Sequence, residues 1–348
     1  MQIGRPEFTN FTRRAPSRPY SPGSLAAEKA EEESIINDAK RAVAGNILNR
    51  TYVIQEKKGI QEWVKIGDFL GKCENEEDTA KAERYYEKLL GELMKFAEKS
   101  KIHALILKKL MYYSSFLFAI TLCPEITMDK AVSRYIAMYV SQEKTIVLPC
   151  TTFEGKINSA LFQEALCHEA VHALDDLSCY ETNKAGQNFL TQRVLKEQIM
   201  PMLDEEMKKN KDLRLKLIEL RRRKIFESTE NKNLSEEEKM REAENSFDKR
   251  PVYIIDKNSK EEAELVKSAT WCWYELDKNT MIVPLMFYFY YFKQVRMEGE
   301  FTEDDLLVLE YIAYGTQIFL SGRNGVLEEK DKKLYELIKN KILPRITK

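Results

Sequence analysis

Apolar residues recur every three or four positions along much of the chain, which is the spacing that one face of an α-helix requires. Three early segments show it, LAAEKAEEESIINDAKRAVAGNILNR, TAKAERYYEKLLGELMKFAEKS and IHALILKKLMYYSSFLFAI, with Gly, Asn and Asp residues between them. We therefore expect residues 25–128 to form an all-helical region.

The pattern changes over residues 134–149, RYIAMYVSQEKTIVLP, where aromatic and β-branched residues flank the polar SQEK. This arrangement predicts a β-hairpin. A helix is expected over residues 158–179, and the last third alternates helical patterns with aromatic segments. The predicted fold class is therefore α+β and predominantly helical.

Residues 196–250 are dominated by Lys, Arg, Glu and Asp. Such runs are typical of solvated helices, and we prefer this interpretation to a specific binding surface. The apolar run at residues 281–292, MIVPLMFYFYYF, is too short to span a bilayer and contains Pro284, so we expect it to lie in the core. No stable membrane insertion is predicted.

Composition narrows the classes of partner. The 348 residues are 43% hydrophobic and 32% charged, and the formal net charge is -1, so no basic field is present to attract nucleic acid. Six scattered cysteines without a CxxC pair indicate reduced thiols and make a cysteine-ligated zinc site improbable. The sequence leaves the oligomeric state open.

Residues 1–24 are polar, contain four prolines and are nearly free of acidic residues. They lack the hydrophobic stretch of a Sec signal, and the prolines oppose the amphipathic helix of a transit peptide. We expect a disordered tail or an export signal. The protein is then soluble, and either cytoplasmic or secreted without a Sec signal.

The segment LFQEALCHEAVHALDDL, residues 161–177, has an apolar half and a polar half on a helical wheel. The apolar half contains Phe162, Leu166, Cys167, Ala170, Val171, Ala173, Leu174 and Leu177. The polar half contains His168, Glu169, His172, Asp175 and Asp176.

Histidines four positions apart project from one face of a helix, so His168 and His172 can reach a single tetrahedral zinc ion. Glu169 lies beside them, placed to act as general base on a water rather than as a ligand. Asp175 and Asp176 are candidates to accept the second imidazole N–H and fix its tautomer. His103 stands alone in KIHALILKKL, and we expect it to have a packing role.

The chain has only three histidines, so the remaining zinc ligand should be a carboxylate. Glu310 is the only charge in LLVLEYIAYG, within a helix that Thr302 and Asp305 open in capping-box spacing and that ends near Gly322. A buried acid there needs a partner, which a metal would supply. Glu310 is therefore preferred, and the alternatives are Glu197, Glu264 and Glu275.

Three strings, HEAVHALDD, EYIAYGTQIFLS and KKLYELIKNKI, resemble the catalytic domain of anthrax lethal factor and its relatives, including the Pro-Pro endopeptidases. The resemblance covers about the C-terminal half. It implies a zincin-like metallopeptidase domain over residues 129–348, with His168, His172 and Glu310 as ligands and Glu169 as base. The spacing between the motifs is longer than in that family, which makes residues of about 196–300 a charged helical insertion.

The chain also departs from the family pattern. Glu303 occupies the position of the family's catalytic tyrosine, and Tyr314 stands where the family has a second glutamate. Tyr314, one turn after Glu310, is the geometric candidate for the missing oxyanion donor. The family also implies that a substrate strand pairs with an edge strand, here expected at residues 144–149.

The string HExxHAxDD is similar to the mitochondrial inner-membrane processing peptidases as well, but the rest of the chain does not follow them. We therefore expect a zinc metalloendopeptidase that acts on a protein or peptide substrate, in the manner of a bacterial effector or toxin delivered into a host cell. The alternative is a catalytically inactive helical interaction protein with a degenerate zincin site.

Overall fold

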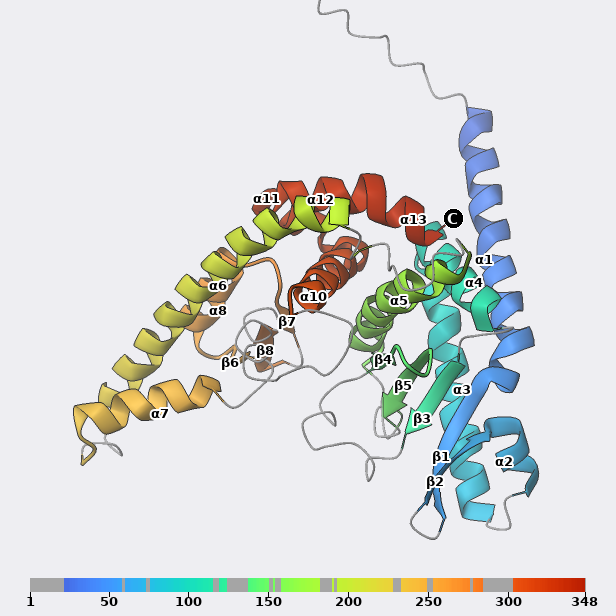
Figure 1. Cartoon of the computed structure of the whole chain (residues 1–348), viewed down its shortest axis with the longest axis horizontal. Coiled ribbons are helices and arrows are strands. Elements are labelled where there is room, and N and C mark those ends of the chain that lie inside the picture. The colour runs from blue at the N-terminus through green and yellow to red at the C-terminus, as the bar shows by residue number, and fades with distance from the viewer. Residues whose placement is uncertain are drawn as a thin grey trace, which may run out of the picture.

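The computed structural model describes a mostly helical α+β protein with two small sheets, which confirms the predicted fold class (Figure 1). The described residues are 22–57, 60–72, 76–114, 119–123, 137–149, 153, 158–181, 190, 193–227, 233–248, 253–275, 278–283 and 303–347. The expected tail at residues 1–24 and the expected boundary near residue 128 fall largely outside these ranges.

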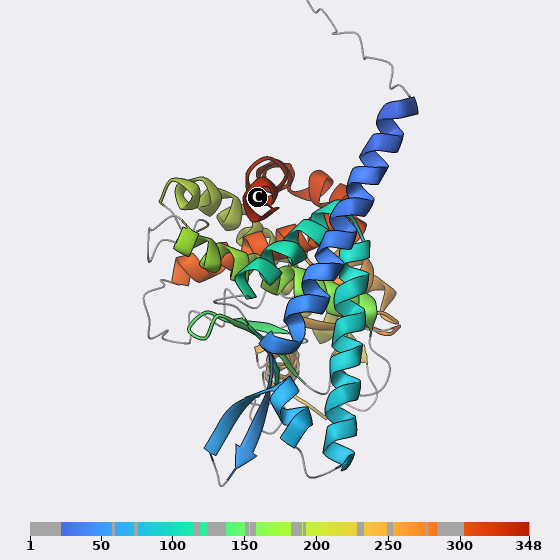
Figure 2. The same ribbon diagram turned by 90° about the vertical axis from the view of Figure 1, so that its right-hand side faces the viewer.

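The N-terminal part is built on three long helices, α1 (Pro22–Arg50), α3 (Glu76–Glu98) and α4 (Lys101–Ser114). The three helices pack against one another, and Figure 2 shows α1 passing beside α3 and across α4. Their apolar stripes are fully buried, as Val43, Leu89 and Ile106 illustrate. A shorter helix, α2 (Ile66–Lys72), lies against the lower end of α3.

A five-stranded sheet has the order β2-β1-β3-β5-β4. Its strands are β1 (Thr51–Lys57), β2 (Ile60–Lys65), β3 (Ala119–Cys123), β4 (Met138–Val140) and β5 (Thr145–Pro149). β1, β3 and β5 are parallel, whereas β2 and β4 are antiparallel to their neighbours and lie at the two edges.

The prediction of an all-helical region over residues 25–128 is therefore wrong in part, because three strands of this sheet lie within it. The segments TYVIQEK and IQEWVK form a hairpin that carries β-branched and aromatic residues, the composition that favours strands. Parallel pairing of β1 with β3 also joins residues that are far apart in sequence, which local periodicity does not register.

The predicted β-hairpin is confirmed, since β4 pairs with β5 around a turn at residues 141–144 in which Lys144 has φ 51°. The expected edge strand is wrong. β5 lies between β3 and β4, so among the described strands it is β4 that forms the edge on this side.

Two central helices pass through the core, α5 (Ser159–Glu181) and α10 (Glu303–Ile318), and they pack against each other (Figure 1). α10 continues into a π-helical turn (Phe319–Arg323), which is kinked at Gly322, where φ is 84°. The C-terminal helices α11 (Asn324–Lys330), α12 (Lys332–Leu337) and α13 (Leu343–Thr347) follow, with a π-helical turn (Ile338–Ile342) between the last two.

Gly315 lets α10 approach the C-terminal helices closely. A Cβ atom at this position would lie 2.8 Å from side-chain atoms of both Leu334 and Ile338. No larger residue fits there without movement, so this glycine helps to fix the helix that carries Glu310.

The remaining elements form a satellite, defined here as the end of α6 (Arg193–Glu227) beyond residue 212, with α7 (Glu236–Asp248), α8 (Lys260–Ala269), β6 (Tyr253–Asp256) and β8 (Thr280–Val283). Its sheet has the order β6-β8-β7, and β7 (Tyr274–Glu275) adjoins the main body. The satellite has its own hydrophobic core around Leu217, Val266 and Met281, whereas α6 residues up to Met207 pack in the main core.

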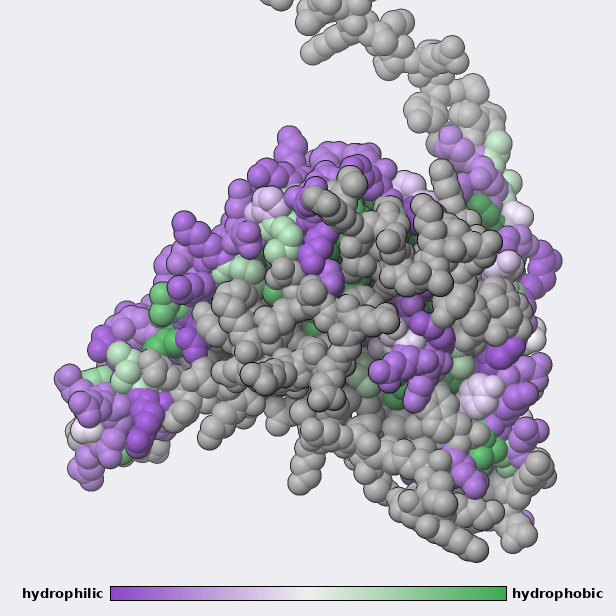
Figure 3. Space-filling view, in the orientation of Figure 1, coloured by the Kyte–Doolittle hydropathy of each residue, from purple (hydrophilic) through white to green (hydrophobic). Residues whose placement is uncertain are grey.

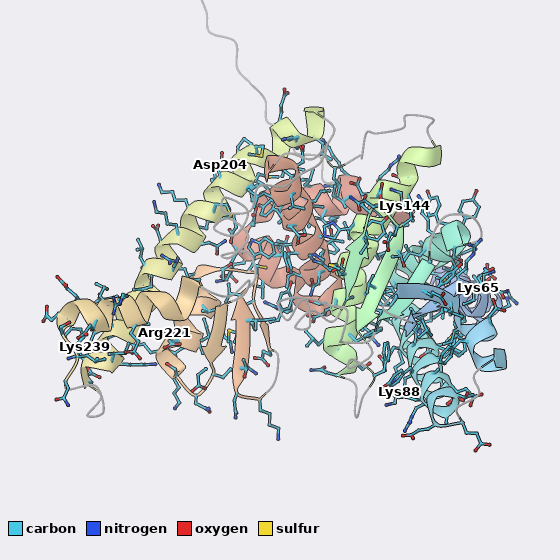
Figure 4. The ribbon with its side chains drawn as sticks, turned by 60° about the horizontal axis from the view of Figure 1, so that its bottom comes forward. Lys65, Lys88, Lys144, Asp204, Arg221 and Lys239 are labelled. Atoms are coloured by element: carbon cyan, nitrogen blue, oxygen red, sulfur yellow. The ribbon has the colours of Figure 1, made fainter. Side chains whose placement is uncertain are left out.

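The outer side of α6 and α7 is mostly hydrophilic in Figure 3. Ion pairs cover part of it, such as Arg222 with Glu219 and Arg223 with Glu261. Figure 4 labels Arg221 of α6 and Lys239 of α7, on the opposite side of the molecule from Lys144. None of the described helices is long and apolar enough to cross a membrane. Met281 and Val283 from the long apolar run are buried, as expected; residues 284–292 are not described.

Candidate metal centre

The helix α5 carries both histidines of HEAVH and is buried on nearly all sides. The eight apolar residues of its predicted apolar half are buried. The predicted polar half is also enclosed, since His168 is 5% exposed, Asp175 3% and Asp176 7%. The polar half therefore faces α10 and β4 rather than solvent, so these groups need partners within the protein.

Glu310 of α10 lies opposite the two histidines. The residue is 9% exposed, and its carboxylate lies 3.1 Å from His168 Nε2 through Oε2 and 3.4 Å from His172 Nε2 through Oε1. The two Nε2 atoms are themselves 3.1 Å apart. His168 and Glu310, separated by 142 positions in sequence, are thus brought together.

These distances fit a metal ion. Bonds of about 2.0–2.1 Å in tetrahedral geometry place neighbouring ligand atoms about 3.3 Å apart. One ligand atom from each of the three residues lies within 4.8 Å of the other two. Two imidazole nitrogens and one carboxylate oxygen are also a ligand set that suits zinc and leaves a fourth position open.

The electrostatic interactions among His168, His172 and Glu310 also favour a bound cation. Burial lowers the pKa of His172, but the Glu310, Glu169 and Asp175 carboxylates raise it more, to about 9. Burial raises the pKa of Glu310, whereas the two imidazoles lower it well below its usual range. The pocket therefore favours an ionised carboxylate beside positive charge, which a proton or a metal cation can supply.

Glu169 is half-buried, interacts electrostatically with the His168 and His172 imidazoles, and also contacts the sheet. Its Oε2 accepts a hydrogen bond from the backbone N–H of Tyr139 in β4, at 2.7 Å. Burial raises the pKa of Glu169, and the His168 and His172 imidazoles oppose this effect. A carboxyl group with a raised pKa next to a metal group is suited to accept and return a proton.

The two aspartates have tasks that the sequence did not predict. Asp176 Oδ2 accepts hydrogen bonds from the Tyr139 hydroxyl and from Lys144 Nζ, both at 2.7 Å, and so ties the hairpin to α5. Figure 4 labels Lys144 beside α5. Asp175 Oδ1 accepts from the Leu190 N–H at 2.9 Å, and its charge also raises the pKa of His172. Asp175 is therefore close to the imidazole, whereas Asp176 acts mainly on β4.

Two tyrosines, Tyr314 and Tyr274, pack one behind the other beside the candidate ligand His168. The Tyr314 ring centroid lies 4.2 Å from that of His168, so Tyr314 packs against a candidate ligand. Tyr274 of β7 is buried and packs against Tyr314 in a tilted arrangement, with ring centroids 6.0 Å apart. Sequence analysis missed Tyr274, which the aromatic string WCWYEL contains without any pattern that would single it out.

The alternative carboxylates lie elsewhere. Glu197 and Glu264 are exposed, and Glu275 is exposed and pairs with Lys257 and Lys267. His103 is buried in α4, where its ring packs on Phe96 at 4.9 Å and Nδ1 lies 2.8 Å from Ser100 Oγ. This agrees with the packing role expected for it.

Comparison of the chain with known protein families, with curated proteins and with solved structures finds no match. The candidate function therefore rests on the arrangement of the residues described above.

Proposed function

We propose that this protein is a zinc-dependent metalloendopeptidase, with His168, His172 and Glu310 as ligands and Glu169 as general base. The observation that carries the proposal is the convergence of three ligand atoms within 4.8 Å in a buried site, with the carboxylate of Glu169 next to them. The resemblance of HEAVHALDD to the lethal factor family supports the same assignment.

The protein's own residues have distinct tasks in this proposal. A bound zinc ion would lower the pKa of a coordinated water and polarise the scissile carbonyl. Glu169 would take the proton from the attacking water at a carboxylate oxygen and deliver it to the leaving amine. His168 is held by Tyr314, whose ring limits the rotation of the imidazole.

The substrate in this proposal is an extended peptide. Among the described strands, β4 lies at the sheet edge next to the candidate site, and sheet edges commonly accept a peptide as an additional strand. Tyr314 is our candidate for the oxyanion donor, because it is the aromatic residue of α10 that packs on a ligand. We further propose, from the family resemblance alone, an effector or toxin that acts on a host protein.

The test uses wild-type protein, the Glu169→Gln variant and a peptide library. The wild type should bind one zinc ion and cleave peptides, whereas Glu169→Gln should keep the zinc and lose at least about 100-fold in rate, since general base catalysis contributes 10²–10⁴-fold. Unchanged cleavage by Glu169→Gln would contradict the mechanism. Zinc binding by a wild type that cleaves nothing would favour the alternative, a catalytically inactive helical interaction protein.

A further inference from the structure

The main-chain N–H of Tyr139 donates a hydrogen bond to Glu169, the candidate base. Tyr139 is the middle residue of β4 and lies opposite Ile146 of β5. Residues of an antiparallel pair alternate between those that exchange hydrogen bonds with the partner strand and those that direct their main-chain groups away from it. Since this N–H is donated to Glu169, it points to the outer edge of β4.

Tyr139 is also fixed through its side chain. Its hydroxyl group donates to Asp176 Oδ2, which in addition accepts from Lys144 Nζ. Asp176 and Glu169 both belong to α5, so Tyr139 contacts this helix through its main chain and its side chain. The N–H is therefore held at a defined place beside the metal ligands, with little freedom to turn away.

A peptide strand that pairs with the outer edge of β4 needs this same N–H. Strand addition forms main-chain hydrogen bonds, and a substrate carbonyl would accept from Tyr139. One N–H cannot make two full hydrogen bonds of good geometry. Glu169 and the substrate strand consequently compete for one donor.

We propose that the Tyr139 N–H holds Glu169 in the resting protein and that a docked substrate strand displaces Glu169, which frees the carboxylate for the attacking water. This inference rests on the proposed function and adds to it a role for the substrate main chain. Binding of an extended strand and release of the base become one event. Tyr139 is a positioning residue here, because it acts through Glu169.

The first test compares zinc-loaded Glu169→Ala and Glu169→Gln, which both lack the base. Gln keeps an acceptor oxygen at this position, and Ala removes it. Amide hydrogen exchange of Tyr139, followed by NMR with ¹⁵N-tyrosine, should be at least about fivefold faster in Glu169→Ala than in Glu169→Gln, the difference expected for one lost hydrogen bond. Equal exchange rates would overturn the inference.

The second test titrates both variants with a pool of random-sequence N-acetylated decapeptides. The pool should bind about fivefold tighter to Glu169→Ala, because no side chain competes for the N–H, and should slow the exchange of Tyr139 again. Equal affinities, or no binding to either variant, would contradict the inference. A zinc-loaded wild type that cleaves nothing overturns the proposed function instead, since the exchange contrast needs neither peptide nor turnover.

Discussion

Glu310 and Glu206 are both buried glutamates on long helices, and they differ in the charge that their surroundings favour. Glu206 of α6 is 1% exposed, accepts from Thr270 Oγ1 at 3.1 Å and lies 3.4 Å from Lys209 Nζ. Burial raises its pKa to about 7, although Lys209 opposes the effect. The pKa of Glu310 is instead lowered, because two imidazoles outweigh its burial.

The difference shows that burial of a carboxylate does not by itself mark a metal site. Glu206 lies where α6 passes from the main core to the satellite, and its hydrogen bond reaches the residue after α8. It joins two parts of the fold. Glu310 is distinguished by the ring nitrogens that face it, and this feature predicts which glutamate binds a cation.

The largest expected effect is a difference in zinc affinity between the Glu310→Gln and Glu206→Gln variants. Glu310→Gln should weaken zinc binding beyond the roughly 10- to 100-fold that partners outside the ligand shell contribute. Glu206→Gln should leave the affinity unchanged, because Glu206 does not belong to the ligand group. Competition titration with a zinc chelator measures both variants. Similar losses in the two would mean that the effect comes from the fold rather than from ligation.

A second prediction concerns pH. The folded pKa of Glu206, about 7, exceeds the unfolded value of 4.5, so its contribution to stability is complete below pH 4.5 and is lost as pH rises through 7. The difference between the folded and unfolded pKa values corresponds to about 3 kcal/mol in the free energy of unfolding. Relative to the wild type, Glu206→Gln should therefore gain up to about 3 kcal/mol in the free energy of unfolding between pH 4.5 and 8.

Urea unfolding at a series of pH values measures this gain, in metal-free samples so that zinc binding does not contribute. Glu206 is nearly inaccessible to solvent, so screening should reduce the effect little. A difference between variant and wild type that does not change with pH would show that Glu206 is ionised in the folded protein at neutral pH.

The smallest expected effect tests how β4 is held beside Glu169. Tyr139→Phe removes the hydroxyl group that donates to Asp176 while it keeps the backbone N–H. Loss of one such hydrogen bond should cost about 1 kcal/mol of stability and leave zinc affinity unchanged. Thermal unfolding with and without zinc is the measurement. A loss of zinc affinity would place Tyr139 among the residues that shape the ligand group.

Sequence patterns predicted the parts of the site that lie on single helices. The four-residue spacing of His168 and His172 fixes their relation within α5, and the isolated charge of Glu310 in an apolar run identified a buried acid. Helical periodicity is a local property, so these predictions needed no knowledge of the fold.

Contacts between distant elements could not be predicted in the same way. Glu206 lies in MLDEEMKKN, which has the composition of a solvated helix, and only the packing of the satellite buries it. The hydrogen bond from Tyr139 to Glu169 and the packing of Tyr274 against Tyr314 depend on how a strand meets a helix. The parallel pairing of β1 with β3 joins distant segments, which local periodicity does not register, whereas the β1–β2 hairpin carries a strand-favouring composition that the helical interpretation overlooked.

The central claim is that His168, His172 and Glu310 bind one zinc ion. X-ray absorption at the zinc edge of the stoichiometrically loaded protein tests it most directly. We predict a shell of nitrogen and oxygen atoms at about 2.0–2.1 Å, with the outer scattering of two imidazole rings. The outer imidazole scattering should fall by half in His172→Ala. Sulfur at about 2.3 Å, or a spectrum that His172→Ala leaves unchanged, would contradict the claim.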